Sequence, residues 1–219
     1  FSPARSATNA RWALNEMRLY SYGFDKYDIP GATGIEKDEL MRAARQIRDY
    51  FNNDMDFLDV QVKLGGVEQS IYKAREILHM KDVKALVRGV YRVQEGAGAY
   101  LLAYALIGFL LWRGAFWRPL ARRVLWGSLA TLGLVVFVGL LSIVDFDQVF
   151  LVFHLVSFTD NLWQLDPYSD FLLMMFPGGF WFDATMFLAL ATVVEALLLG
   201  RTSWALLRQH RKVADRVSR

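Results

Sequence analysis

Histidine is the side chain in this sequence best suited to proton transfer near neutral pH, and the chain has three of them. His79 lies in the segment REILHMKDVK, which also contains Arg75 and Asp82. Their spacings of four and three residues place the three side chains on one face of a helix. A carboxylate beside the imidazole would fix its tautomer and raise its basicity, so His79 is a candidate general base with Asp82 as its orienting partner. The alternative is an ordinary surface helix with pairs of charged side chains.

His154 stands in an otherwise apolar segment, VFLVFHLVSF. Placing an imidazole there costs hydration, and only a partner or a function would offset that cost. Asp147, His154 and Asn161 are spaced by seven residues and drift by only about 20° per step on a helix, so they could form one polar seam. The alternative is a core histidine bonded to a backbone carbonyl. The third histidine, His210, lies in a basic tail and is expected to be solvated.

The segment after His154, TDNLWQLDPYSDFLLMMFPGGFWFD, mixes aspartates and prolines with aromatic residues. This pattern predicts a capped turn that leads into a short amphipathic helix at the membrane surface. Its aspartates could bind Ca²⁺, but their spacing matches no EF-hand loop, and solvated aspartates in a turn explain them equally well. No HExxH or comparable spacing suggests zinc. We therefore predict no metal site.

The chain has no cysteine, which excludes disulfides, thiolate metal ligands and a cysteine nucleophile. Residues 1–95 hold 15 of the 25 Lys and Arg and 14 of the 22 Asp and Glu, whereas residues 124–200 contain no Lys or Arg. The two parts of the chain therefore face different solvents. The basic residues do not form one stripe, so we predict no nucleic-acid binding.

Three apolar stretches are long enough to cross a bilayer, which takes roughly 20 helical residues. We therefore predict an all-α polytopic membrane protein. The chain is expected to begin with a mainly helical outer region at 1–95. Transmembrane helices follow at 96–112, 124–144 and 179–199, with a loop at 113–123 between the first two and an interfacial segment at 145–178 between the last two. A basic tail at 200–219 ends the chain.

The charges that flank the apolar stretches predict their orientation. Arginines cluster between the first two stretches and after the third, and Lys and Arg favour the cytoplasmic side. The segment from Asp145 to Asp183 carries six Asp and no Lys or Arg, so it and residues 1–95 are expected to lie outside the cytoplasm. Three spans with this orientation need a translocation signal, so we expect a fourth helix ahead of Phe1.

The outer region is expected to be mainly helical. Residues 36–52 contain strong helix formers with apolar positions at helical spacing. The segment YDIPGATGI is predicted to be a turn because of its proline and glycines. VQVKLGG suits a short strand or an extended connection, and residues 67–95 suit a helix that continues into the first span.

Three elements of the chain, ARWALNEMRLYSYGFDKYDIPGATGI, REILHMKDVKAL and FHLVSFTDNLWQLDPYSDFLLMMFPGGFWFD, occur in an order that resembles a known pattern. They resemble the bacterial integral membrane family of the lipoprotein intramolecular transacylase, Lit. The resemblance covers nearly the whole chain, and HMxDVK and WxLDPxxD are its specific parts. The family would have a first transmembrane helix where this sequence has only FSPARSATN.

The resemblance implies an enzyme of the bacterial cytoplasmic membrane that acts on membrane lipid and lipoprotein. It would move an acyl chain from the diacylglyceryl group of a lipoprotein to the α-amine of its N-terminal cysteine, without a cofactor. One of His79 and His154 would act as base and the other as acid or oxyanion partner, with Asp82 as orienter. The candidate substrate-binding residues are Arg75, Asn161, Trp163 and Asp166.

A second class of function remains open on the sequence alone. The chain could be a non-catalytic subunit of a larger photosynthetic or respiratory membrane complex. In that case His154 might ligate a chlorophyll-type pigment or a haem, and the aromatic-rich spans would pack against other membrane-protein subunits.

Overall fold

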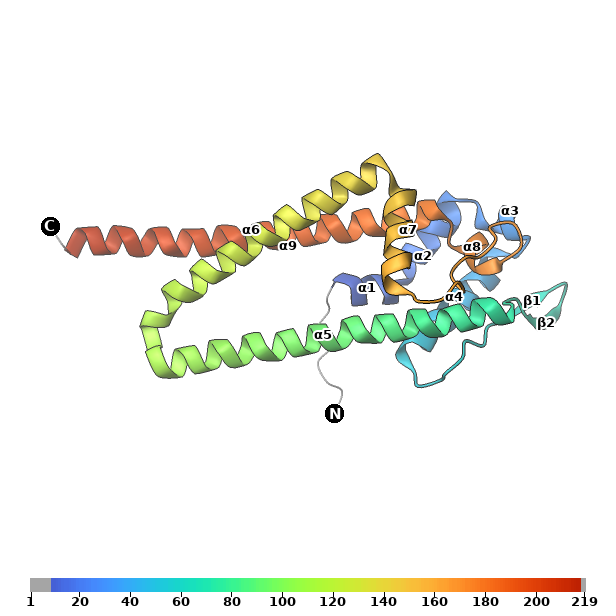
Figure 1. Cartoon of the computed structure of the whole chain (residues 1–219), viewed down its shortest axis with the longest axis horizontal. Coiled ribbons are helices and arrows are strands. Elements are labelled where there is room, and N and C mark those ends of the chain that lie inside the picture. Colours follow the sequence, from blue (N-terminus) through green and yellow to red (C-terminus); the bar gives the residue numbers. More distant parts are fainter. Residues whose placement is uncertain (1–8, 218–219) are drawn as a thin grey trace. The chain divides into compact units, whose positions relative to one another are not determined.

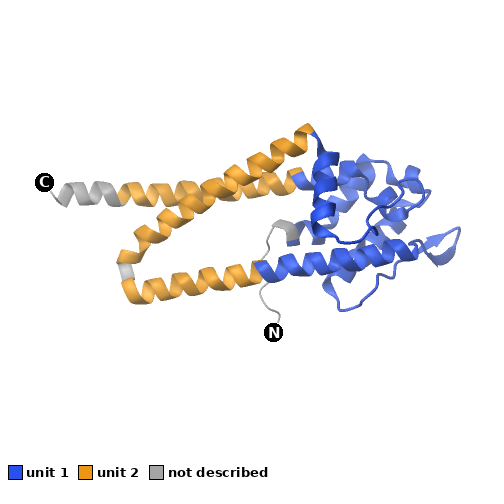
Figure 2. Cartoon of the chain, in the orientation of Figure 1, with its two compact units in different colours: residues 1–93, 145–185 blue, residues 94–144, 186–219 orange. Residues whose placement is uncertain are grey.

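A computed structural model of the chain describes residues 9–217, with the side chains of residues 9–10, 113–114 and 210–217 excepted. The expectations for His210 and for a helix ahead of Phe1 fall outside this description. The chain divides into two compact units (Figure 2). Unit 1 comprises the residues up to Val93 and Asp145–Thr185, and unit 2 comprises Gln94–Val144 and the residues from Met186 onward.

Unit 1 begins with four helices (Figure 1), and the second to fourth of them supply nearly half of the residues of its buried core. The last of them, α4, confirms the predicted helix at residues 36–52. Its buried residues recur at helical spacing, and Asp38 and Glu39 in its first turn complement the positive end of the helix dipole. The four helices are α1 (Asn9–Asn15), α2 (Met17–Lys26), α3 (Ile29–Thr33) and α4 (Lys37–Asn52).

The segment predicted as a turn, YDIPGATGI, contains the short helix α3 instead. The Asp28 side chain accepts a hydrogen bond from Gly31 N at 3.3 Å and so satisfies a free N–H of the first turn. Pro30 fits the first turn of a helix because the missing N–H would have no helical partner there. Gly34 then ends the helix at a φ of 69°. The proline and glycine that suggested a turn are here the start and stop signals of a helix.

The prediction of one helix over residues 67–95 was wrong at its start. Residues Val67–Ser70 form strand β2, which pairs antiparallel with β1 (Gln61–Leu64), and the helix α5 begins only at Ala74. Gly65 and Gly66 join the strands with φ angles of 59° and 86°. Positive φ at both positions of a two-residue loop produces a tight hairpin, and glycine adopts it without strain.

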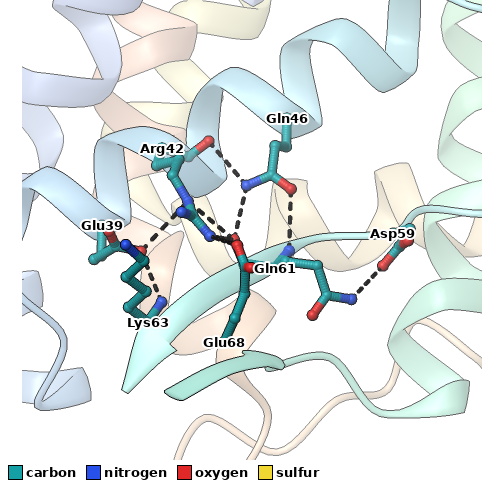
Figure 3. Close-up of polar contacts among 7 residues, drawn as sticks. All are labelled: Glu39, Arg42, Gln46, Asp59, Gln61, Lys63 and Glu68. Carbon is teal, nitrogen blue, oxygen red and sulfur yellow. Dashed lines mark hydrogen bonds and ion pairs between the residues drawn. The ribbon is translucent and has the colours of Figure 1, made fainter. Parts of the chain in front are cut away.

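Side chains of α4 cover the edge of β1 that faces away from β2 (Figure 3). Gln46 donates to Gln61 O at 2.9 Å and accepts from Gln61 N at 3.0 Å. Glu39 accepts from Lys63 N at 2.7 Å. Arg42 donates to Gln61 O at 2.8 Å and pairs with Glu68 on β2 at 2.5 Å. An edge strand with satisfied backbone groups cannot recruit another strand, and these bonds fasten the hairpin to α4.

The rest of unit 1 comes from the segment between the second and third apolar stretches. Helix α7 (Phe146–Ser157) is capped by Asp145, whose side chain accepts from Gln148 N at 3.0 Å. A turn and the short helix α8 (Phe171–Met175) follow as predicted, although the N-cap residue Asp170 makes no side-chain cap bond. The seam proposed for Asp147, His154 and Asn161 does not form, because α7 ends at Ser157 and Phe158 is extended.

Three helices are long and apolar enough to cross a membrane. They are α5 (Ala74–Trp112), α6 (Trp117–Val144), which follows the short 3-10 helix η1 (Arg113–Phe116), and α9 (Gly178–Val217). Most of their unit 2 side chains are apolar and exposed, as lipid-facing side chains are. The buried hydroxyls of Ser128 and Ser142 donate to the carbonyls of Val124 and Val138 at 2.8 and 2.9 Å, so neither is left unbonded.

Candidate active site

Two imidazoles from distant parts of the sequence lie next to each other in unit 1. His79 comes from the second turn of α5 and His154 from α7. Their ring centroids are 6.2 Å apart with the planes inclined by 29°. The two residues are buried, with 6% and 9% of their surface exposed. The structure thus brings together the two histidines that the sequence singled out for proton transfer.

His154 has a defined hydrogen bond at one ring nitrogen. Its Nδ1 lies 2.8 Å from the carbonyl oxygen of Phe150, one turn earlier in α7. A carbonyl can only accept, so Nδ1 carries the proton and Nε2 of the neutral ring keeps its lone pair. Phe150, Phe158 and Trp163 surround the ring, with centroids 4.4, 5.6 and 5.1 Å away. His154 thus has the carbonyl bond expected of a core histidine, and its Nε2 still keeps a lone pair that can accept a proton.

His79 has a less favourable environment for a charge. Its ring packs against Phe158 at 5.1 Å, and Nδ1 is buried without a hydrogen-bond partner. The apolar part of α5 begins near Gly96, so His79 lies outside the part that suits a membrane span. Burial and then the neighbouring His154 lower the pKa of His79 to about 4, although the charge of Asp160 acts the other way. The ring is neutral at physiological pH.

Asp82 points to a different partner from the one predicted. Its carboxyl lies near that of Asp160, in the turn after α7. Burial, followed by the charge of Asp160, raises the pKa of Asp82. The role of Asp82 as orienter of His79 stays a prediction, since the described residues give no bond between the two side chains.

The four predicted substrate-binding residues all lie on or against the connection between α7 and α8. Arg75 in the first turn of α5 donates to the backbone carbonyl of Asn161 at 2.5 Å, and its side chain is exposed. Trp163 contacts His154 directly. Asp166 accepts from Tyr168 N at 3.0 Å and from Ser169 Oγ at 2.9 Å. Arg75 and Trp163 are thus placed beside the histidine pair, whereas Asp166 holds the turn together.

Glu76 is the residue near the site that the sequence did not reveal. It is fully buried, and its two carboxylate oxygens accept from Lys73 N and from Leu172 N, each at 2.7 Å. It therefore ties the start of α5 to α8. An acidic residue in the first turn of a helix is common and usually exposed, so no sequence signal distinguishes Glu76 from a surface charge.

A second contact joins the same two elements at the surface. Lys73 pairs with Asp170 at 2.7 Å, and Asp170 also accepts from Asp166 N at 2.7 Å. These two donors lower the pKa of Asp170, with the bond to Lys73 as the larger cause. The start of α5 is thus fixed to the α8 segment by two buried carboxylates, those of Glu76 and Asp170.

Among the side chains that the structure describes, three or more of His, Asp or Glu nowhere come together in a group that could hold a metal ion. The arrangement offers two buried imidazoles among aromatic side chains. One of them has a free basic nitrogen. That combination suits the transfer of a proton between two groups of a bound substrate.

We expect Glu76→Gln to destabilise unit 1. An amide can accept only one of the two N–H bonds and turns its own NH₂ group toward the other donor. The expected loss is about 1–3 kcal/mol, the usual cost of an unsatisfied buried group. Thermal unfolding in detergent measures it. Glu36→Gln, at an exposed helix start without a side-chain cap bond, serves as the matched control. Equal unfolding midpoints for the two variants would contradict the role of Glu76.

The pKa of His79 can be measured by NMR on protein labelled selectively at its three histidines. The signal that disappears in the His79→Gln variant belongs to His79 and should titrate with a midpoint near pH 4. The ring should therefore still be neutral at pH 6.5, the ordinary pKa of histidine. The unfolded chain takes up this proton at higher pH than the folded one. The contribution of His79 to stability is therefore complete above about pH 6.5 and is lost as the pH falls toward about 4. A midpoint near 6.5 would show that the ring is solvated.

Comparison with known proteins identifies relatives over most of the chain. A sequence model of the family described as lipoprotein intramolecular transacylase Lit matches residues 7–181. An uncharacterized protein of Aquifex aeolicus is 25% identical over 195 residues, which cover 87% of this chain and 83% of the relative.

Solved structures show the same fold. The in meso structure of the membrane integral lipoprotein intramolecular transacylase Lit from Bacillus cereus matches with a TM-score of 0.75 and 20% identity, over 93% of this chain and 89% of that one. A structure of the same protein with a histidine-to-alanine substitution matches with a TM-score of 0.71 and 19% identity, over 93% of this chain and 87% of that one. The predicted fold class, a mainly helical polytopic membrane protein, is confirmed. The chain belongs to the lipoprotein intramolecular transacylase family, Lit.

Proposed function

We propose that this protein is an intramolecular transacylase that moves the sn-2 acyl chain of a diacylglyceryl lipoprotein to the α-amine of the same lipoprotein's N-terminal cysteine. The observation that carries this proposal is the buried pair of imidazoles, 6.2 Å apart, in a chain of this family. The pair offers a proton acceptor and a hydrogen-bond donor, which are the two groups that acyl transfer from an ester to an amine requires.

The reaction forms one bond and breaks one. The nitrogen of the neutral α-amine attacks the ester carbonyl carbon, and a tetrahedral intermediate with a negative oxygen forms. The bond from that carbon to the sn-2 glycerol oxygen then breaks, which leaves an amide and a free hydroxyl. A base takes the proton that the nitrogen loses and returns it to the glycerol oxygen. Atoms and charge balance without a cofactor, and we expect none.

The two histidines suit different parts of this sequence of steps. His154 keeps a lone pair at Nε2, and the carbonyl that accepts from its Nδ1–H fixes the tautomer and the orientation of the ring. We therefore assign it the role of base. His79 resists protonation because it is desolvated and next to another imidazole. A neutral ring can still donate an N–H to the negative oxygen, so His79 is assigned to the oxyanion.

The surrounding residues fit substrate positioning. Arg75 has an exposed guanidinium that is already oriented by the carbonyl of Asn161, and such a group can donate to an ester or a backbone carbonyl of the substrate. Trp163 shields His154 from water on one side. Exclusion of water matters here, because water would compete with the amine for the acyl group.

The reaction requires access from the lipid phase. The protein is an integral membrane protein of a family that acts on lipoproteins. We infer that residues 1–95 and 145–178 face the outside of the bacterial cytoplasmic membrane and that the C-terminus is cytoplasmic. The arginine-rich segments after the first and third spans support this orientation, because such segments stay on the cytoplasmic side. The histidine pair would then be at the outer leaflet.

A role as a non-catalytic subunit that binds a pigment or haem gains no support from the comparisons. His154 would also have to exchange its present aromatic neighbours for a large planar ligand.

Replacement of either histidine should remove most of the activity. We expect His154→Ala and His79→Ala to lower the conversion of a co-expressed diacylglyceryl lipoprotein to its lyso form by about 10²–10⁴-fold, the usual contribution of acid–base catalysis. Mass spectrometry of the lipoprotein's N-terminal peptide gives the position of each acyl chain. The control is Tyr168→Phe, at a residue with 90% of its surface exposed, which should behave like the unchanged protein.

Full conversion by both histidine variants, at normal levels in the membrane, would contradict the proposed function. If only His154→Ala loses activity, the role of His154 as base stands and the role of His79 at the oxyanion is wrong.

A further inference from the structure

Helix α7 has two faces of unlike character. It is 12 residues long, about 18 Å, and therefore cannot cross a hydrocarbon core of about 30 Å. One face carries the buried His154. Leu151, Val152, Leu155 and Val156, which we call the outer face of α7, are 39%, 48%, 60% and 83% exposed. A helix that faces water has polar residues opposite its buried side, and here they are apolar.

The outer face is regular as well as exposed. Its residues follow the i, i+1, i+4, i+5 spacing that lines one side of a helix, with Val152 and Val156 opposite His154 and Leu151 and Leu155 to its side. Apart from Ser157 at the C-terminal end, the polar groups of α7 that can reach water are confined to its first turn. Contiguous exposed apolar surface of this kind marks contact with a membrane or a partner.

The chain itself indicates which of these contacts applies. Only Asp145 separates α7 from α6, whose composition and length suit a membrane span. The last residues of α6, Ile143 and Val144, are 65% and 83% exposed, so exposed apolar residues run along the chain up to the cap of α7. A chain that leaves the hydrocarbon at Val144 and returns to apolar residues at once has not moved far from the bilayer.

An aromatic contact within unit 1 supports the same conclusion. Trp181, at the start of the third span, packs against Phe150 of α7 at 6.2 Å, and indole rings favour this boundary.

We propose that α7 lies in the plane of the membrane with its outer face among the lipid acyl chains of the outer leaflet. A helix is about 10 Å wide with its side chains, so His154 on the opposite side would be held at the level of the glycerol esters. This consequence rests on the proposed function, because the ester of the substrate lies at that level. The embedding of α7 itself does not depend on it.

The absence of cysteine allows a direct test with a single spin label. Val156→Cys and, independently, Val152→Cys are labelled with a nitroxide in the full chain. The protein is reconstituted in vesicles of phosphatidylethanolamine and phosphatidylglycerol. Power saturation then compares collisions with oxygen, which concentrates in acyl chains, and with a water-soluble nickel chelate. Tyr168→Cys is the water-exposed control.

We expect both outer-face labels to collide severalfold more with oxygen relative to nickel than the control label does. A nickel collision rate equal to that of the control would place the outer face in water and overturn the proposal. Low rates with both reagents would show that a protein partner or a second copy covers the face, which also overturns it. Transacylase activity is measured separately in the same vesicles with the unlabelled chain, so its absence would refute the proposed function and leave the depth measurement intact.

Discussion

The carboxylate of Glu76 holds together the two parts of the chain on which the site depends. It is fully buried, and a desolvated carboxylate remains stable only where donors replace its lost water. The N–H groups of Lys73 and Leu172 supply them, so the start of α5 and the start of α8 are drawn to one point. His79 follows one turn later on α5. The connection that ends at α8 carries Phe158 and Trp163 against the imidazoles, so its path is fixed from both ends.

Desolvation also separates the properties of the two histidines. Both rings are buried among aromatic side chains, and close neighbours of the same kind cannot both take up a proton. The carbonyl of Phe150 accepts a bond from Nδ1 of His154, whereas Nδ1 of His79 has no partner and the pKa of His79 is lowered to about 4. Two equally buried residues of the same type thus differ in their hydrogen bonding, and the proposed mechanism assigns them different roles on that difference.

The sequence revealed the elements whose pattern is local. The helix at residues 36–52, the three apolar spans and the turn before α8 follow from apolar periodicity, span length and turn residues. The two histidines stood out because one occupies a charged helical face and the other an apolar segment. Pairing them required tertiary structure, as did the contact of Asp82 with Asp160 and the burial of Glu76. At residues 67–70, the positive φ angles of Gly65 and Gly66 turned an expected helix into a strand.

The central claim is that this chain transfers an acyl group within one lipoprotein molecule, and a crossover measurement tests it most directly. Purified protein in lipid vesicles is given two synthetic diacylglyceryl lipopeptides of different peptide mass, one of which carries an isotopic label in its sn-2 acyl chain. The account predicts that mass spectrometry will find the label as an amide on the α-amine of its own peptide, with a free sn-2 hydroxyl. Label that stays at the sn-2 ester would contradict the activity. Label on the other peptide would contradict the intramolecular path.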